Sequence, residues 1–165
     1  MQKTVLLLFI IFPLLAYSQI NINKTKAEIK KEIAKFKKST PAFSVTVSET
    51  DSTLTTIKTE ANKNKEEALL EFDKAGKCRS ELRIFNCDHC FKKELETLLG
   101  MDKYKWEKLN ENQYISKFEE KLLIELPTEN KTNTIRIIRT DWNKVLYDIM
   151  KGKYSIDRYY FSANP

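Results

Sequence analysis

Apolar positions along the chain recur first at helical spacing. In residues 25–38 they form one stripe, made of Ile29, Ile33 and Phe36. Thr25 opens this segment and Glu28 follows three residues later, which is the spacing of a helix capping box. The pattern predicts a first helix over residues 25–38.

Spacing of two residues, which is typical of strands, comes next. Residues 43–48 alternate apolar and polar side chains, and a threonine-rich run covers residues 54–57 after a turn at 50–52. Residues 58–67 are mainly polar, and we expect a loop there. Two short strands and a loop are therefore predicted before the next apolar run.

A hairpin follows that loop. Residues 68–72 alternate into the turn at 74–76, and residues 78–84 alternate out of it. A three-residue turn that ends in a left-handed glycine, here Gly76, sets the register of the two strands. The expected opposite pairs are Phe72 with Cys78, Leu70 with Ser80 and Ala68 with Leu82. This register points Cys78 into the core.

The second half of the chain shows the same two spacings. Residues 88–99 carry a helical apolar stripe that ends at Gly100, and Asp141 is the expected N-cap of a third helix. The expected buried stripe of that third helix is Trp142, Val145, Leu146 and Ile149. Strands are predicted over residues 104–109, 113–118, 122–126, 135–137 and 154–161.

The order of these elements repeats along the chain. A helix and about four strands are followed by another helix and four strands, and then by a last helix. Residues 68–72 resemble 122–126, and residues 82–85 resemble 135–138, at offsets of 54 and 53 residues. Alternating strands also resemble one another by chance, so a true duplication and a chance likeness stay open. Either alternative predicts an α+β fold, a mostly antiparallel sheet with two or three helices and a possible tandem helix-plus-four-strands repeat.

The first eighteen residues have the layout of a secretory signal. Lys3 precedes an apolar run, and Ala16 and Ser18 are the small residues of a signal-peptidase site. The run holds about a dozen residues, whereas a membrane span needs roughly 20. A membrane anchor or a buried helix is the alternative interpretation. We expect a signal peptide over 1–18, a single α+β domain over 19–165 without a transmembrane span, and a secreted or periplasmic location.

Composition limits the class of protein and of partner. The chain is 41% apolar and 11% aromatic with three cysteines in 165 residues, which argues against both disorder and a disulfide scaffold. The net charge is +6, but the lysines are scattered and are not interleaved with stacking aromatics. We therefore expect no nucleic-acid partner. Another protein or an acidic envelope component is the expected partner.

Two resemblances point to the same class of protein. The run from Thr25 to Ile29, just after a short leader, resembles the helix opening of small envelope proteins of the outer-membrane-assembly lipoprotein type. The doubled helix-plus-four-strands plan is similar to the β-lactamase-inhibitory-protein fold. Both families are non-catalytic and bind other proteins, so the resemblance implies a non-enzymatic binding role. The chain lacks the lipidated Cys and the Leu-Gly-x-Pro of the lipoprotein type, and no functional residue is transferred.

One motif carries chemistry. Cys87 and Cys90 lie three residues apart at the start of the predicted helix 88–99, where a helix N-terminus stabilises a thiolate. The Cys-x-His-Cys run resembles the active-site motif of exported thiol–disulfide oxidoreductases of the thioredoxin superfamily. This resemblance implies that Cys87 is the nucleophile, that Cys90 is the resolving thiol and that His89 stabilises the thiolate. A thiol–disulfide oxidoreductase is therefore the alternative function.

The other reading of this motif is a structural disulfide. A thioredoxin-like frame needs the strands before and after the helix to be parallel neighbours, whereas the strands predicted here form hairpins. Cys78 and Cys87 lie along one predicted strand, roughly 30 Å apart at 3.3 Å per residue, and a disulfide needs Cα atoms within about 7 Å. We therefore expect a Cys87–Cys90 disulfide and a lone, buried Cys78.

Other sites receive less support from the residues. Cys87, His89 and Cys90 lack a second ligand pair at zinc spacing, and no cofactor motif is present. With one histidine and no nucleophile elbow, a Ser-His-Asp site is not expected. The aromatic side chains of Tyr104, Trp106 and Tyr114 are expected at the rim of the core, with a binding patch as the alternative.

Overall fold

The structure is a computed structural model that describes residues 19–60, 64–128 and 133–152. The predicted signal peptide over 1–18 and the predicted last strand over 154–161 lie outside these residues. No helix of the described part is both long and apolar enough to cross a membrane.

Three helices and eight strands make up the described part, which has the expected α+β class. In chain order they are α1 (Lys26–Ser39), β1 (Phe43–Glu49), β2 (Thr53–Glu60), β3 (Lys65–Phe72), β4 (Cys78–Phe85), α2 (Asp88–Leu99), β5 (Glu107–Asn110), β6 (Gln113–Ile115), β7 (Leu122–Glu125), β8 (Asn133–Arg139) and α3 (Lys144–Met150).

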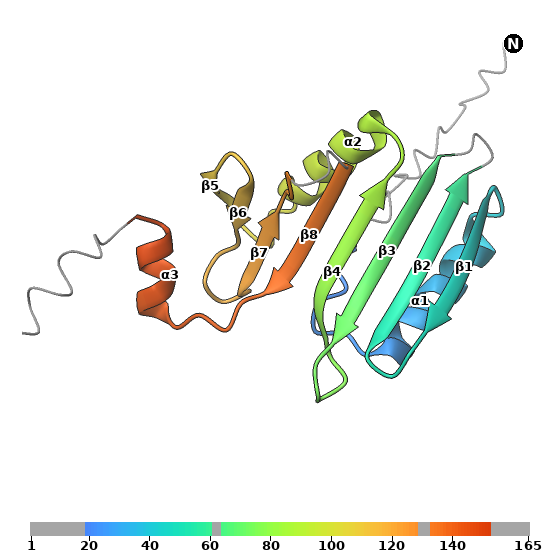
Figure 1. The fold of residues 1–165 in the computed structure, drawn as a ribbon, viewed down its shortest axis with the longest axis horizontal. Helices are drawn as coiled ribbons and strands as arrows, with labels where there is room; N and C mark the ends of the chain where they lie inside the picture. The colour runs from blue at the N-terminus through green and yellow to red at the C-terminus, as the bar shows by residue number, and fades with distance from the viewer. Residues whose placement is uncertain (1–18, 61–63, 129–132, 153–165) are drawn as a thin grey trace, which may run out of the picture.

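The eight strands form one sheet in the order β1-β2-β3-β4-β8-β7-β6-β5 (Figure 1). All neighbouring strands are antiparallel. β1 to β4 form one meander after α1, β5 to β8 form a second meander after α2, and the last strands of the two meanders pair with each other. The doubled helix-plus-four-strands order expected from the sequence is therefore present in the fold.

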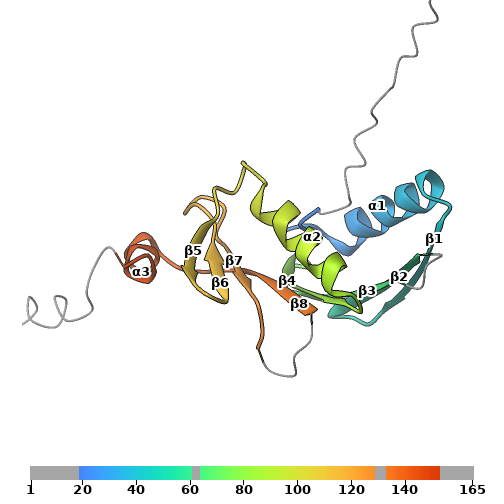
Figure 2. The ribbon, with the colours of Figure 1, turned by 90° about the horizontal axis from the view of Figure 1, so that it is seen from above.

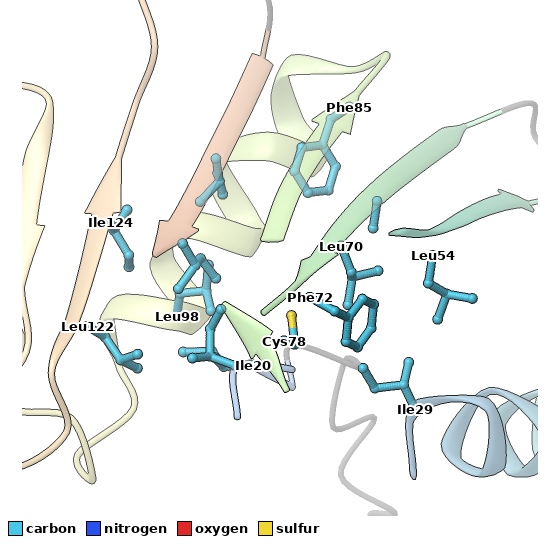
Figure 3. Close-up of a cluster of buried hydrophobic side chains, with 14 residues drawn as sticks. Ile20, Ile29, Leu54, Leu70, Phe72, Cys78, Phe85, Leu98, Leu122 and Ile124 are labelled. Atoms are coloured by element: carbon cyan, nitrogen blue, oxygen red, sulfur yellow. The ribbon is translucent and has the colours of Figure 1, made fainter. Parts of the chain in front are cut away.

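Both long helices pack on the same face of the sheet (Figure 2). Between this face and the helices lies the core, whose buried aliphatic side chains come from α1, α2 and the central strands (Figure 3). The segment that precedes α1 adds Ile20 and Ile22 to this core. α3 lies apart from the other two helices, beside the β5–β6 end of the sheet (Figures 1 and 2).

Local sequence signals explain the first helix and the central turn. The Thr25 hydroxyl accepts the Glu28 backbone N–H at 3.3 Å, and the Glu28 carboxylate accepts the Thr25 N–H at 2.7 Å. This capping box satisfies two backbone donors that the first turn would otherwise leave without partners. At the β3–β4 turn, Gly76 has φ +71°, the left-handed conformation that was predicted for it.

The prediction of a loop over residues 58–67 is wrong. β2 continues to Glu60 and β3 begins at Lys65, with Lys58 directly opposite Glu66. The two side chains form an ion pair at 2.5 Å. Cross-strand charge pairs stabilise a ladder as apolar pairs do, so a strand can continue where apolar alternation stops.

The expected register of the β3–β4 hairpin is correct only next to the turn. Phe72 lies opposite Cys78, but Glu71 lies opposite Ser80, so Arg79 is an extra residue on β4. This β-bulge shifts the remaining pairs by one position, and Leu70 faces Glu81 instead of Ser80. The expected pair of Ala68 with Leu82 is likewise wrong, because Ala68 faces Arg83. The bulge turns Glu81 and Arg83 toward the helices and Leu82 toward the other face of the sheet.

The third helix begins later than expected and buries a different face. Its N-cap is Asn143, whose side chain accepts the Leu146 N–H at 2.9 Å, and not Asp141. Val145 and Leu146 are 44% and 40% exposed. Tyr147 is buried instead, because α3 packs beside the β5–β6 end of the sheet and not on the main core. Contacts of Tyr147 with Ser116 and Phe118 set this orientation: its hydroxyl donates to the Ser116 carbonyl at 2.9 Å, and its ring lies 5.4 Å from that of Phe118.

Candidate functional site

Cys87 and Cys90 form a disulfide at the N-terminus of α2, with their Cα atoms 5.3 Å apart. Cys87 is also the N-cap of this helix, and its Sγ accepts the backbone N–H of Cys90 at 3.0 Å. Both cysteines are half-buried, whereas Asp88 and His89 between them are exposed. The sulfurs therefore lie between the helix terminus and the surface.

The strands around α2 do not provide the frame that the oxidoreductase alternative requires. β4, which precedes α2, pairs with β3 and β8, while β5, which follows it, pairs within the described residues only with β6. Three strands separate β4 from β5 in the sheet, and every pairing is antiparallel. The thioredoxin-type arrangement of parallel neighbours beside the helix is thus absent from the described part.

Cys78 lies in the core and is not paired with another cysteine. Its thiol donates to the Ser80 carbonyl at 3.5 Å. Burial, with the nearby negative charge of Glu81, raises the pKa of Cys78 to about 12. A thiol of that pKa is neutral and chemically quiet at physiological pH.

A buried ionic cluster lies near Cys78, further along the same face of β4. The alternation of apolar and polar residues in the sequence does not reveal it. It consists of Glu81 and Arg83 on β4 and Glu94 on α2, with side chains 2%, 2% and 12% exposed. Arg83 donates from Nε to Glu81 Oε1 at 2.9 Å and from Nη1 to Glu94 Oε1. Its Nη2 donates to the Gln19 carbonyl at 2.8 Å, which ties the segment before α1 to the sheet.

The remaining groups of this cluster are also satisfied. Asn21 donates to Glu81 twice, from its side chain at 2.9 Å and from its backbone N–H at 3.0 Å. Burial by itself would lower the pKa of the Arg83 guanidinium, but the charges of Glu81 and Glu94 outweigh burial and raise it. Arg83 therefore remains charged, and its role in this geometry is to hold the N-terminal segment and α2 on the sheet.

A small cavity of about 60 Å³ lies beside the cluster, between α1 and the sheet. Its lining includes Glu81, Arg83 and the Lys58–Glu66 ion pair. The volume accommodates a few water molecules rather than a substrate. No group of three His, Cys, Asp or Glu side chains that could hold a metal ion occurs among the described residues.

The face of the sheet opposite α1 and α2 has an apolar centre that none of the described helices covers. Because Leu70 and Ala68 point to the helices, Leu69 between them points to the other face, where it lies opposite Leu82. Ile84, on the same side as Leu82, is half-buried. We call this surface the apolar stripe; its members are Ile57, Leu69, Leu82, Ile84 and Ile138.

Charged side chains border the apolar stripe and also interrupt it, because Glu67 lies directly opposite Ile57 and Ile84, and Arg136 lies directly opposite Leu82. Three of their ion pairs are at least partly exposed to solvent: Arg79 with Glu71 at 3.7 Å, Arg136 with Glu125 at 3.8 Å and Lys65 with Glu67 at 3.3 Å. Pairs of this kind contribute little to stability, about 0–1 kcal/mol each. An apolar centre inside a polar rim is the usual anatomy of a protein–protein contact surface.

Three aromatic residues considered as a possible patch lie against the core. Tyr104, Trp106 and Tyr114 are half-buried and pack on the core cluster, with the rings of Tyr104 and Trp106 5.4 Å apart. Burial is the main cause of the raised pKa of the Tyr104 hydroxyl. The expectation that these side chains form the rim of the core is confirmed.

No protein-family model, curated protein or solved structure matches this chain. The functional argument therefore depends on the geometry of the surfaces and sites described above.

Proposed function

We propose that this chain is a non-enzymatic, exported protein that binds another protein through the apolar stripe. The observation that carries the proposal is the five aliphatic side chains that lie together on a sheet face without helix cover among the described residues. Contiguous apolar surface inside a polar rim marks interaction sites in soluble proteins. An open sheet face suits a folded protein partner better than a small molecule, which needs a concave pocket.

Export is the second part of the proposal. The predicted cleavage site lies between Ser18 and Gln19, and the residues directly after it belong to the folded domain. Ile20 and Ile22 are 6% and 7% exposed in the core, and the Gln19 carbonyl is bonded to Arg83. N-terminal sequencing of the exported protein is expected to begin at Gln19. Exported material that retains residues 1–18 would contradict this cleavage site.

The binding proposal is tested by capture followed by substitution. Immobilised residues 19–165 are incubated with an envelope extract of the source cells, and the captured protein is identified, purified and titrated calorimetrically. Ile84→Asp puts a charge into the stripe and is expected to weaken binding by about ten-fold or more. Ile57→Asp, nearer the rim, is the second variant in case Ile84→Asp unfolds. Asn112→Asp adds the same charge on the exposed β5–β6 turn and is the matched control.

The result that contradicts the proposal is equally specific. Binding that is unchanged in folded Ile84→Asp and Ile57→Asp, or that is lost equally in Asn112→Asp, would remove the apolar stripe as the binding surface. Circular dichroism and urea unfolding of each variant show whether a loss of binding reflects a loss of fold.

The alternative, a thiol–disulfide oxidoreductase that uses Cys87, Cys90 and His89, is favoured by one observation. The disulfide lies at a helix N-terminus with half-buried sulfurs and an exposed His89, a position that stabilises a thiolate. The antiparallel surroundings of α2 support the structural reading instead. A disulfide-exchange assay, described in the Discussion, distinguishes the two.

A further inference from the structure

The two edges of the sheet are built differently. β5, at one edge, has four residues, and its pairing shifts between Lys108 and Asn110. A short, irregular strand that carries a lysine is a usual protection against pairing with another chain. β1, at the other edge, has seven residues without Pro or Lys, and it pairs with β2 without any register shift. β1 is therefore a regular edge without these protections.

Backbone hydrogen bonds show which residues of β1 face outward. Thr50 donates its N–H to the Thr53 carbonyl at 3.2 Å, so this is a hydrogen-bonded pair at the β1–β2 turn. Hydrogen-bonded and non-hydrogen-bonded pairs alternate in an antiparallel ladder. The N–H and C=O groups of Val45, Val47 and Glu49 consequently point away from β2, toward the free edge. No strand of the described part pairs with that edge.

A groove runs beside these groups, between β1 and α1. Its volume is about 360 Å³, and its apolar lining comes from Ile33 and Ala34 on α1 and Val47 on β1. α1 lies over this part of the sheet (Figure 2). A strand added to β1 would therefore place every second side chain in the groove, since successive side chains of a strand point to opposite faces.

The charge at the groove identifies the kind of strand that fits. Lys30, Lys37 and Glu49 supply the charges of its lining, which leaves one net positive charge. Lys30 forms an ion pair with Glu49 at 2.5 Å, whereas Lys37 forms none with any described residue. α1 as a whole carries six lysines and two glutamates. Two copies joined edge to edge at β1 would bring two such helices together, with like-charge repulsion. An acidic segment meets the opposite charge instead.

We propose that β1 binds an extended, acidic segment of a partner protein, which adds to the sheet as a further strand. The segment pairs with the outward backbone groups of Val45, Val47 and Glu49, and its carboxylates lie beside Lys30 and Lys37. The inference rests on the proposed function of protein binding and specifies a second contact and its chemistry. Main-chain pairing supplies affinity in such strand addition, and the side-chain groove supplies specificity.

The spacing of the two lysines defines the probe. Lys30 and Lys37 lie seven residues apart, which is roughly 10 Å along the helix axis. Same-face residues of a strand lie about 6.7 Å apart at a spacing of two residues and about 13 Å apart at a spacing of four, and the flexible lysine side chains span the difference of about 3 Å from the wider spacing. The probe is a synthetic peptide that repeats Thr-Val-Thr-Glu. Its Thr side chains share one face of the strand, and its Val and Glu side chains share the other, where successive Glu lie four residues apart. One control peptide carries Lys in place of Glu. Two further control peptides are N-methylated at alternate residues, one at the odd and one at the even positions, so that each blocks pairing along one edge of the added strand.

The experiment titrates these peptides into residues 19–165 and follows backbone amide shifts and hydrogen exchange by NMR. Saturable binding of the acidic peptide is expected, with added exchange protection at Val45, Val47 and Glu49. The Lys peptide, and the N-methylated peptide whose blocked edge faces β1, are expected not to bind. Shifts concentrated on the apolar stripe, or equal binding of the Lys peptide, would overturn the proposal.

Variants give an independent measure. Lys30→Gln with Lys37→Gln is expected to weaken peptide binding by about ten-fold, since charge-assisted contacts are lost. The matched control, Lys31→Gln with Lys35→Gln, removes the same charge from residues that do not line the groove, and is expected to change binding by less than about two-fold. Equal effects in the two double variants would overturn the charge argument.

Val47→Pro tests the backbone contact. Proline removes only an outward N–H here, and edge strands tolerate it where that N–H faces solvent. We expect a loss of about ten-fold in peptide affinity, and an unchanged affinity in a folded variant would overturn strand addition. If Val47→Pro does not fold, the N-methylated peptides carry the same test. A homodimer of residues 19–165 that is lost in the lysine variant would also overturn the choice of partner.

The two proposals fail separately. Ile84→Asp, in the apolar stripe, is expected to leave peptide binding unchanged. If the acidic peptide does not bind but Ile84→Asp still weakens binding of the captured protein, only the edge-strand proposal is overturned. If the acidic peptide binds as expected but Ile84→Asp does not change binding of the captured protein, only the proposal that the apolar stripe is the binding surface is overturned.

Discussion

Replacement of Arg83 by Met tests whether the buried ionic cluster stabilises the fold. Met has a similar length but no charge, so the substitution leaves Glu81, which is 1% exposed, without its cationic partner. It also leaves the Gln19 carbonyl without the donor that lies 2.8 Å from it. Removing one partner of a buried ion pair costs about 3–5 kcal/mol. The total free energy of unfolding of a domain of this size is about 5–15 kcal/mol, so the variant should fold but have little remaining stability.

Two further variants identify the cause of this loss. Arg83→Met combined with Glu81→Gln neutralises the more deeply buried carboxylate, so that only Glu94, whose side chain is 12% exposed, still loses its bond to Arg83. We expect the double variant to recover about half of the lost free energy, because Glu81 is then no longer a buried charge without a cationic partner. Arg136→Met is the matched control. Arg136 lies on β8, is 44% exposed and is 3.8 Å from Glu125, so its loss should cost less than about 1 kcal/mol.

Urea unfolding followed by circular dichroism and by tryptophan fluorescence measures each free energy of unfolding. Equal losses in Arg83→Met and Arg136→Met would refute the reasoning. So would a double variant as unstable as Arg83→Met alone, because the loss would then not come from the carboxylate left in the core.

Three further predictions concern the cysteines and one surface ion pair. Replacing Cys87 and Cys90 by Ser should lower the free energy of unfolding by at most about 2–3 kcal/mol, because the closed loop is short; rapid disulfide exchange with an unfolded substrate that disappears in Cys87→Ser would establish the oxidoreductase alternative instead. Cys78, with a pKa of about 12, should react with a thiol reagent only after unfolding, and labelling of the native protein at neutral pH would contradict its burial. A hydrogen bond from Arg139 is the main cause of the lowered pKa of Asp73, so this carboxylate adds stability above its ordinary pKa and loses it as the pH falls through the lowered value. The stability difference between wild type and Arg139→Gln should therefore shrink from about pH 7 to about pH 2, and a constant difference would exclude the pair as its source.

Much of the architecture could be predicted because its signals are local. The capping box at Thr25 and the stripe that follows it specify α1 within a single segment, and the turn at Gly76 specifies the neighbouring hairpin. The repeated order of helix and strands was readable in the same way. Each of these features depends on residues only a few positions apart.

The errors come from contacts between residues distant in the sequence. On β4, either the pair Leu82 and Ile84 or the pair Glu81 and Arg83 could face the helices, because both pairs have the two-residue spacing of a strand. The bulge at Arg79 decides that Glu81 and Arg83 do so. Burial of Glu81 further needs Asn21, which lies 60 residues away. The buried face of α3 is likewise decided by Ser116 and Phe118, and not by the helix itself.

Neither candidate binding surface could be located from the sequence. The apolar stripe exists because the bulge places Leu82 on the face without helices, opposite Leu69. The exposed edge of β1 exists because the two meanders join through β4 and β8, which leaves β1 at the end of the sheet. Strand order is a property of the whole chain, so no single segment contains the signal for an edge.

The sheet order also constrains the folding pathway. Every ladder between named strands joins neighbours in the sequence except that between β4 and β8, whose partners lie roughly 50 residues apart. Each meander can therefore form through short loops, and the entropy of closing a long loop opposes only the last pairing. We expect the docking of β4 on β8 to limit the folding rate. Substitutions in this seam should slow folding, whereas those in the outer strands should mainly speed unfolding.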